Sequence, residues 1–278
     1  MDAYQFSGGT AVVTGAASGI GAALAALLAA RGSNLVLVDR DKERLDGVAE
    51  QVRRAHPALT VDTYVVDLSD DAATAEAADA LAAAHSGTTL LVNNAGVALG
   101  GRFDQVTLEE FDWVMAVNFR SVVRLTHAFL PVLKAHPGSH LATVSSVFGI
   151  FAPAGQAAYS ASKFAVRGFS EAVRHELAED GVGVTVVHPG GIKTRIAETA
   201  RTGSGVSSEE YEQGRKQFAK LLRMPPEDAA AQIVAAVEKR RPRLLIGASA
   251  KIPDVLVRLM PGSYWKLIAR RAGRPAER

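Results

Sequence analysis

The chain has 278 residues, 48% of them hydrophobic, and a formal net charge of +2. The complete lack of cysteine excludes a disulfide framework and any metal site built on thiolates. Length and composition favour one large α/β domain, or at most two, with a substantial buried core.

The N-terminus and the longest apolar run bear on the location of the protein. The opening stretch MDAYQF lacks the basic region and long apolar run of a secretory signal. The longest apolar run, residues 22–30, is mostly alanine and falls well short of the roughly 18 residues that cross a membrane. Because the absence of cysteine also fits a reducing compartment, we expect a cytoplasmic protein.

Short apolar runs alternate with helical patterns along the chain. In order, the expected elements are strand 10–14, helix 19–31, strand 34–38, helix 41–54, strand 60–66, helix 70–85, strand 89–92, helix 107–135, strand 140–145, helix 156–179, strand 182–187, helix 227–239 and strand 244–246. Continuous apolar strands separated by helices predict a parallel sheet with helices on both faces. We expect a single domain over residues 1–249.

Two of the expected helices begin with capping signals. Ser69 is expected to cap helix 70–85. Thr107, with Glu110 three residues later, predicts a capping box. The segment 191–224, in contrast, has no clear sheet pattern.

A glycine-rich turn, Thr14–Gly21, separates the first strand from the first helix. Glycines there permit a close approach of the backbone to a pyrophosphate, and a helix N-terminus adds N–H groups and a positive dipole. The spacing G-x-x-x-G-x-G differs from the common G-x-G-x-x-G fingerprint, so a purely structural turn is an equal alternative. Asp39 favours a nucleotide site, because an acid that ends the second strand can accept hydrogen bonds from an adenosine ribose. The alternative role for Asp39 is a helix cap.

Ser146, Tyr159 and Lys163 are the candidate catalytic residues. Tyr159 and Lys163 are four residues apart, on one face of a predicted helix, where the ammonium is expected to lower the pKa of the phenol. Ser146 could hold a substrate oxygen beside Tyr159. A lone Tyr-x-x-x-Lys pair is more often an ordinary pair on a helix surface, so other motifs must decide between the two interpretations.

Six motifs in matching order resemble those of the short-chain dehydrogenase/reductase (SDR) family over roughly residues 8–247. They are TGAASGIG at 14–21, NNAG at 93–96, Asn118, Ser146, Tyr159-x-x-x-Lys163 and His188-Pro189-Gly190. The resemblance implies one Rossmann-type, doubly wound domain with a seven-stranded parallel sheet and a nicotinamide cofactor.

The resemblance also implies a role for each matched residue. Tyr159 would be the general acid/base, Lys163 would lower its pKa and bind the nicotinamide ribose, and Ser146 would orient the substrate oxygen. Asn118 would hold a water in the proton relay. The expected cofactor contacts are Gly15, Ser18, Gly19, Ile20 and Gly21 in the turn, Asp39 and Arg40, Asp67 and Leu68 at the adenine, Asn94, Ala95 and Gly96, Tyr159 and Lys163, and Pro189, Gly190, Ile192 and Thr194 at the nicotinamide and phosphates.

The choice of cofactor depends on two neighbouring residues of opposite charge. The Asp39 carboxylate would repel a 2′-phosphate, which favours NAD. Arg40 beside it is a residue type that binds phosphate, so NADP is the alternative.

The resemblance further implies a homodimer or homotetramer, formed through helices 107–135 and 156–179. Ala157, Ala161 and Ala165 give the second helix a small-residue stripe, whose alternative role is packing on its own sheet.

The segment 191–224 would cover the substrate. A hydrophobic alcohol or ketone is suggested by its apolar residues and those after Ser146, although they could equally pack the loop itself; they are Ile150, Phe151, Ile192, Ile196, Tyr211, Phe218 and Leu222. Residues 97–101 would form the opposite rim.

Residues 250–278 form a basic extension beyond the family's usual core. From Lys239 to Arg278 there are eleven Lys or Arg and two acids, a net charge of +9, which leaves −7 for the rest of the chain. The break at Pro261-Gly262 predicts two short helices. A peripheral membrane contact is the weaker hypothesis, and docking on the chain's own body or on a sister subunit is preferred. No nucleic-acid motif accompanies the charge, and the histidines show no metal-ligand spacing.

The leading prediction is therefore an oxidoreductase that moves a hydride between nicotinamide and a secondary alcohol or ketone. The alternative is a non-catalytic nucleotide-binding regulator with the same fold. The presence of Ser146, Tyr159 and Lys163 favours the enzyme.

Overall fold

The computed structural model describes residues 1–219 and 221–271. Its centre is a sheet of seven parallel strands in the order β3-β2-β1-β4-β6-β7-β9, which confirms the predicted Rossmann-type sheet. The strands are β1 (Thr10–Thr14), β2 (Asn34–Asp39), β3 (Val61–Val65), β4 (Thr88–Asn93), β6 (His140–Val144), β7 (Gly183–Pro189) and β9 (Arg243–Ile246). The strand order reverses between β1 and β4, and in such sheets ligands bind beyond the carboxyl ends at this point.

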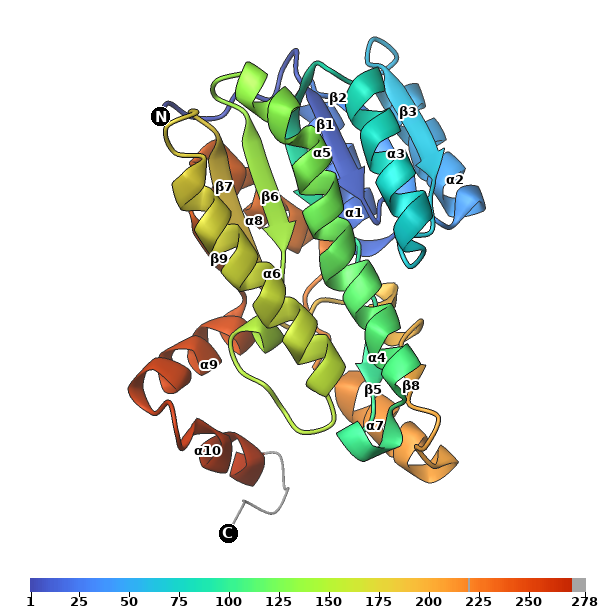
Figure 1. Ribbon diagram of the computed structural model, residues 1–278, viewed down its shortest axis with the longest axis vertical. Coiled ribbons are helices and arrows are strands. Elements are labelled where there is room, and N and C mark those ends of the chain that lie inside the picture. Colours follow the sequence, from blue (N-terminus) through green and yellow to red (C-terminus); the bar gives the residue numbers. More distant parts are fainter. Residues whose placement is uncertain (220, 272–278) are drawn as a thin grey trace.

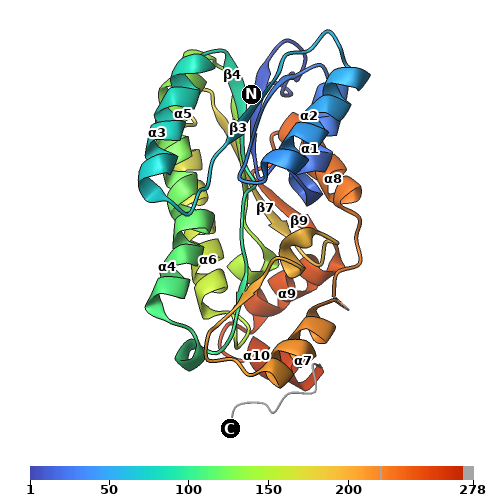
Figure 2. The ribbon, with the colours of Figure 1, turned by 90° about the vertical axis from the view of Figure 1, so that its right-hand side faces the viewer.

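Helices cover both faces of the sheet (Figures 1 and 2). One face carries α1 (Gly19–Ala30), α2 (Lys42–Ala55) and α8 (Pro226–Glu238), and the other carries α3 (Asp71–Ala84), α5 (Ser121–Ala135) and α6 (Ala157–Glu176). Each face buries its own apolar cluster against the strands. The strands are apolar on both sides because both sides are covered.

The helix expected over residues 107–135 is interrupted. It consists of α4 (Leu108–Met115), a π-helical turn η2 (Ala116–Arg120) and α5. The predicted capping box is confirmed, since the Thr107 hydroxyl accepts the Glu110 N–H at 3.2 Å and the Glu110 carboxylate accepts the Thr107 N–H at 2.9 Å. A π turn of this kind often occurs at functional sites, and this one contains Asn118.

The prediction that Ser69 caps α3 is wrong. The N-cap is Asp70, whose carboxylate accepts the N–H groups of Ala72 and Ala73 at 3.0 Å each. Ser69 instead donates to Asp67 from both its backbone N–H and its hydroxyl. The Asp70 carboxylate therefore takes the capping role, while the Ser69 side chain is bonded to Asp67.

The segment 191–224 has more structure than the sequence pattern predicts. It contains the turn η4 (Arg195–Ala197), the strand β8 (Arg201–Thr202) and the helix α7 (Ser208–Ala219). β8 pairs with β5 (Leu99–Gly100), just before the turn η1 (Phe103–Gln105). Two-residue strands have no periodicity to detect, so this small second sheet could not be predicted.

The C-terminal extension forms two short helices, α9 (Ala248–Leu259) and α10 (Tyr264–Arg271), on either side of the predicted break. Buried Asp254 pairs with Arg243 of β9, so α9 docks on the body of the chain itself. Ile252, Val255 and Leu259 are exposed on its outer side. Within the described part of the chain, no helix combines the length and apolarity needed to cross a membrane.

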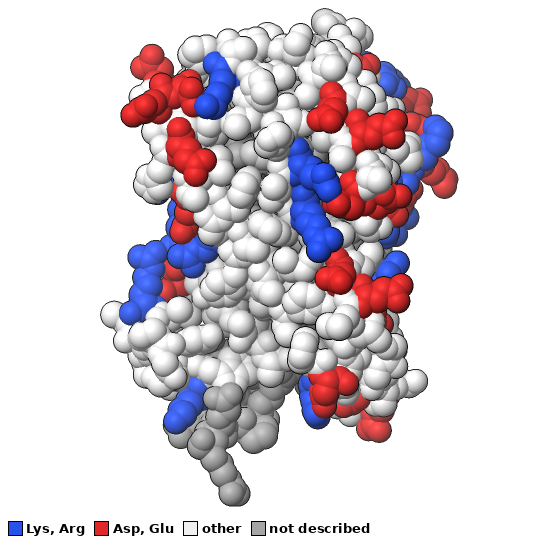
Figure 3. Space-filling view, viewed as in Figure 1, with Lys and Arg blue, Asp and Glu red and all other residues white. Residues whose placement is uncertain are grey.

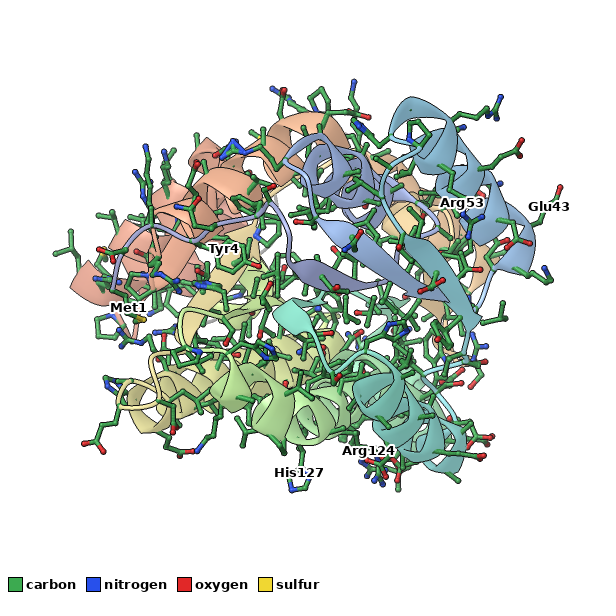
Figure 4. The ribbon with its side chains drawn as sticks, turned by 90° about the horizontal axis from the view of Figure 1, so that it is seen from above. Met1, Tyr4, Glu43, Arg53, Arg124 and His127 are labelled. Atoms are coloured by element: carbon green, nitrogen blue, oxygen red, sulfur yellow. The ribbon has the colours of Figure 1, made fainter. Side chains whose placement is uncertain are left out.

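The N-terminal segment covers the end of the sheet at which β6 begins. Figure 4 shows the Tyr4 side chain directed into the protein body, where its hydroxyl lies 2.8 Å from the Thr89 hydroxyl. His140 lies beneath it, fully buried, with Nε2 2.8 Å from the Thr185 hydroxyl. Burial and the nearby Arg240 cation lower the pKa of His140 to about 3.

We expect this histidine to make folding stability depend on pH. Since the unfolded chain binds the proton near pH 6.5 and the folded chain does not, stability is fully present above pH 6.5 and falls as the pH decreases towards 3. The expected loss between pH 7.5 and pH 5 is about 2 kcal/mol for His140. Urea unfolding at the two pH values measures the loss, and His140→Gln should remove that part of it. An unchanged pH dependence in the variant would contradict this assignment.

Candidate active site

A cavity of about 1270 Å³ lies beyond the carboxyl ends of the strands. It brings together nearly all residues that the sequence predicts for the site. The predicted catalytic and cofactor residues that line it are Gly15, Ser18, Gly19, Ile20, Asp39, Arg40, Asp67, Leu68, Asn94, Ala95, Gly96, Ser146, Tyr159, Lys163, Pro189, Gly190, Ile192 and Thr194. Gly21 and Asn118 do not line the cavity themselves, but they contact segments that do.

The glycine-rich turn fits a pyrophosphate. A Cβ at Gly21 would lie 2.0 Å from the Gly15 carbonyl oxygen, so α1 can approach the end of β1 this closely only with glycine. Ser18, the N-cap of α1, forms no side-chain cap hydrogen bond. The first turn of α1 thus presents backbone N–H groups to the cavity wall, as anion sites at helix N-termini do.

We expect Gly21→Ala to damage this turn. The added methyl would collide with the Gly15 carbonyl and should cost about 1–3 kcal/mol of unfolding free energy, as overpacking does. The dissociation constant for NADH should rise at least about tenfold, a change worth about 1.4 kcal/mol. Gly47→Ala in α2 is the matched control, because a Cβ there meets no atom within 4 Å and alanine is the better helix former. Equal NADH affinity in the two variants would contradict the assignment.

Asp39 ends β2 at the opposite side of the turn. Its carboxylate accepts the N–H of Ala17 and the N–H of Asp41, both at 3.0 Å, so each oxygen has one backbone donor and a lone pair remaining. The alternative role of Asp39 as a helix cap is wrong, because the N-cap of α2 is Asp41. The carboxylate is fixed in the position where a ribose would be bound.

Asp67 follows β3 at the same rim. Burial alone would raise the pKa of its carboxyl, but the net shift is downward because of the Ser69 hydrogen bonds and the cations of Arg40 and Arg201. Arg40 is exposed and attracts the Asp67 carboxylate electrostatically. Part of the positive charge of Arg40 is therefore already balanced.

Asn94 joins the glycine-rich turn to the end of β4. Its side-chain amide donates to the carbonyl of Thr14 at 2.9 Å and to that of Gly15 at 3.3 Å. The Thr14 hydroxyl in turn accepts the N–H groups of Asn94 and Ala95 at 3.0 Å. This network holds the turn in the shape that the cavity requires.

Ser146, Tyr159 and Lys163 lie together where β6 ends and α6 begins. Tyr159 forms a side-chain hydrogen bond with Ser146, and the Lys163 ammonium lies 5.7 Å from the centre of the Tyr159 ring. All three are buried at the cavity wall. Lys163 donates to the Val144 carbonyl at 3.1 Å, which leaves two of its three N–H donors for other partners.

The pKa of Tyr159 differs from the expectation. Burial raises it, and the hydrogen bond with Ser146 opposes this change without cancelling it. Burial also lowers the pKa of Lys163 to about 8. The attraction between ammonium and phenolate predicts a lower pKa for Tyr159, but in the structure the removal of both groups from water is the larger effect.

The Asn118 side chain forms three hydrogen bonds within the protein. The oxygen accepts the Val97 N–H at 2.8 Å, and the amide donates to the Val97 carbonyl and the Ser162 hydroxyl at 3.0 Å each. It therefore ties the loop after β4 to α6. A Cβ at Gly96 would lie 3.2 Å from the Lys163 nitrogen and 3.3 Å from the Asn118 oxygen, so glycine leaves room between these groups.

His188 at the end of β7 packs where expected. It is fully buried, and its Nδ1 lies 3.0 Å from the Ser146 carbonyl, to which it can donate. Burial lowers its pKa to about 4. Among the described residues, no group of histidines and acids has the arrangement of a metal site.

The expected apolar wall is mostly present. Phe151, Ile192, Ile196, Tyr211 and Leu222 line the cavity, together with the opposite rim at Val97, Ala98, Gly100 and Gly101. Ile150 is buried but does not reach it, and the side chain of Phe218 lies outside the described residues. Four further residues line the cavity that the sequence does not predict for it: Phe148, Arg201, Ser249 and Trp265.

A sequence model of the short chain dehydrogenase family matches residues 9–205. The chain belongs to the short-chain dehydrogenase/reductase family. As an SDR it is an oxidoreductase with a nucleotide-binding Rossmann fold. It is 42% identical over 269 residues to the Mycobacterium tuberculosis protein named "Putative oxidoreductase SadH", covering 95% of each chain.

Two solved SDR structures share this fold. One, from Burkholderia phymatum in complex with NAD, has a TM-score of 0.80 and 26% identity and covers 99% of this chain and 98% of its own. The other, a metagenomic SDR in complex with NADP, has a TM-score of 0.71 and 31% identity and covers 87% and 98%. Both cofactors thus occur among similar SDRs.

Proposed function

We propose that this SDR transfers a hydride between a nicotinamide cofactor and a secondary alcohol or ketone, with the buried Tyr159 as the general acid/base. The observation that carries the proposal is the contact of Tyr159 with Ser146 beside Lys163, in the cavity that also contains the glycine-rich turn. A phenol, a hydroxyl and an ammonium around one substrate oxygen match the proton transfer that carbonyl reduction requires.

Each side chain has a distinct role in this proposal. The Ser146 hydroxyl and the Tyr159 phenol hold the substrate oxygen, and Tyr159 gives it a proton during reduction or removes one during oxidation. Lys163, with its spare N–H donors, binds the nicotinamide ribose and stabilises the phenolate. Asn118 holds the loop at Val97 against α6 through its hydrogen bonds to Val97 and Ser162. The second acceptor lone pair of its oxygen can hold a relay water. The nicotinamide, when bound, would supply the hydride in ketone reduction and accept it in alcohol oxidation.

The proposed cofactor is NAD rather than NADP. Asp39 is held by two backbone N–H groups, so its carboxylate cannot turn away from a 2′-phosphate. Arg40, which could favour that phosphate, lies in the field of Asp67. Charge repulsion by a fixed carboxylate should therefore prevail over attraction by an exposed guanidinium.

The proposed substrate is hydrophobic. Phe148 packs edge-on against Tyr159, with ring centres 6.0 Å apart, and Phe151 packs on Phe148 at 5.3 Å. Both rings line the cavity beside the proposed position of the substrate oxygen. Apolar rings at this position bind an apolar substituent and exclude water from the reacting atoms.

The test is reduction of apolar ketones by NADH, followed by the loss of NADH absorbance. We expect turnover by the native chain and loss of turnover in Ser146→Ala and Lys163→Met. The non-catalytic alternative instead expects NADH binding with no turnover of any ketone and no difference among these variants.

The proposed assembly is a homodimer or homotetramer formed through α4, α5 and α6. Ala157 and Ala161 are exposed on α6 rather than packed on its own sheet. Figure 3 shows a broad uncharged band down the middle of this face, and depletion of charge is typical of interface cores. Figure 4 shows that Arg124 and His127 point outward from α5 on the same side.

A further inference from the structure

A row of aromatic rings connects the catalytic tyrosine to the C-terminal extension. Tyr159 contacts Phe148 at 6.0 Å between ring centres, Phe148 contacts Phe151 at 5.3 Å, and Phe151 contacts Tyr264 of α10 at 6.5 Å. All three contacts are edge-to-face, the geometry that aromatic pairs prefer. Tyr264 is 105 residues from Tyr159 in the chain, so this contact depends on how the extension folds back.

The next residue, Trp265, lines the same cavity as Tyr159 and Lys163. Its side chain is half-buried, as is that of Tyr264. The extension is therefore part of the cavity wall. A short substrate whose oxygen lies at Tyr159 would end near Phe148, whereas one that extends past Phe151 would meet the aromatic pair of α10.

The extension is anchored by a buried ion pair. Asp254 of α9, with 7% of its surface exposed, accepts both terminal nitrogens of Arg243 from β9, at 3.1 and 2.5 Å. Arg258 adds a second contact to the same carboxylate at 3.2 Å. Two parallel N–H···O bonds fix orientation as well as distance, so α9 has a defined position on the sheet.

The beginning of α9 is also joined to the proposed nicotinamide segment. The Ser249 hydroxyl accepts the Gly191 N–H at 3.1 Å, and Ser249 itself lines the cavity. A Cβ at Gly190 would lie 2.1 Å from that hydroxyl, which indicates how closely the two segments approach. The extension thus contacts the cavity at both α9 and α10.

We propose that the C-terminal extension is a wall of the substrate site and that Trp265 is a specificity-determining residue, which binds the apolar part of a long or aryl-substituted alcohol or ketone. This inference rests on the proposed function. Trp265 contacts the substrate far from the reacting atoms and selects for its length, whereas Ser146 and Tyr159 bind the substrate oxygen. An alternative role for the tail aromatics, insertion into a lipid surface, would leave substrate selectivity unaffected.

The first test compares butan-2-one with dodecan-2-one, reduced by NADH, in the native chain and in Trp265→Ala. We expect KM for dodecan-2-one to rise about tenfold at similar kcat, because the lost contact binds ground and transition states alike. KM for butan-2-one and the dissociation constant for NADH should stay unchanged. A shift of equal size for both ketones, or none for dodecan-2-one, would overturn the proposal.

The second test reads Trp265 directly and needs no turnover. The chain has two tryptophans, and Trp113 lies on α4, stacked by Arg201 at 3.9 Å and outside the cavity wall. In Trp113→Phe, emission from Trp265 should change on addition of dodecan-2-one but not butan-2-one. The matched control, Trp265→Phe, retains Trp113 and should give no change.

The two tests separate the possible failures. If the native chain reduces neither ketone but Trp265 emission still responds to dodecan-2-one, the proposed reaction is wrong, but the C-terminal extension still forms a wall of the binding site. If dodecan-2-one is reduced and Trp265 emission does not respond, the proposed reaction is correct, but the C-terminal extension is not a wall of the substrate site.

Discussion

Tyr159→Phe should lower kcat by about 10²–10⁴-fold, the usual contribution of a general acid or base. The substitution removes only the hydroxyl, and the ring still packs against Phe148 and near Lys163. NADH affinity should therefore stay nearly unchanged. Steady-state reduction of dodecan-2-one, together with NADH titration of the same preparation, measures both effects.

Tyr64→Phe is the matched control for this experiment. The Tyr64 hydroxyl lies 2.9 Å from His85 Nε2, and the residue is not among those that line the cavity. It should retain native turnover after the same change of residue type. If Tyr159→Phe also retained native turnover, Tyr159 would not be the acid/base, and the family resemblance would have assigned its role wrongly.

Asp39→Ala should change the cofactor preference. Loss of the carboxylate removes the ribose acceptor and the repulsion of a 2′-phosphate, so NADH should bind about tenfold more weakly and NADPH at least about tenfold more tightly, about 1.4 kcal/mol each. Fluorescence titration with each nucleotide gives the two dissociation constants. Arg40 should account for part of the gain in NADPH affinity.

Asp39→Asn separates charge from hydrogen bonding. The amide oxygen can still accept one of the two backbone N–H groups that Asp39 now binds, from Ala17 and Asp41, while the negative charge is lost. NADPH affinity should rise here too, with a smaller loss for NADH than in Asp39→Ala. An unchanged NADH-to-NADPH ratio in both variants would mean that Asp39 does not select the cofactor.

The sequence was informative wherever a motif depends on fixed spacing. Thr14–Gly21 and the Tyr159–Lys163 pair each lie within one local element, so their geometry follows from turn and helix periodicity. Seven continuous apolar strands likewise predict a parallel sheet, which the structure confirms. Contacts within one element, or at the ends of neighbouring strands, were therefore predictable.

The remaining features depend on contacts between distant segments. The pairing of β5 with β8 involves two residues on each side and has no pattern of its own. Trp265 lies in a basic extension for which the sequence predicts two short helices, but only the docking of Asp254 on Arg243 brings the extension to the cavity. The raised pKa of Tyr159 is likewise a consequence of burial, which periodicity cannot measure.

The most direct test of the central claim is calorimetric titration of the native chain with NADH and, separately, with NADPH. Asp39 would bind the adenosine part of the nucleotide, and the first turn of α1 would bind its pyrophosphate. We therefore expect saturable binding of both nucleotides, with a lower dissociation constant for NADH than for NADPH. Preference for NADPH would mean that Arg40 prevails over Asp39. Binding of neither nucleotide would contradict the account of this cavity as a nicotinamide site.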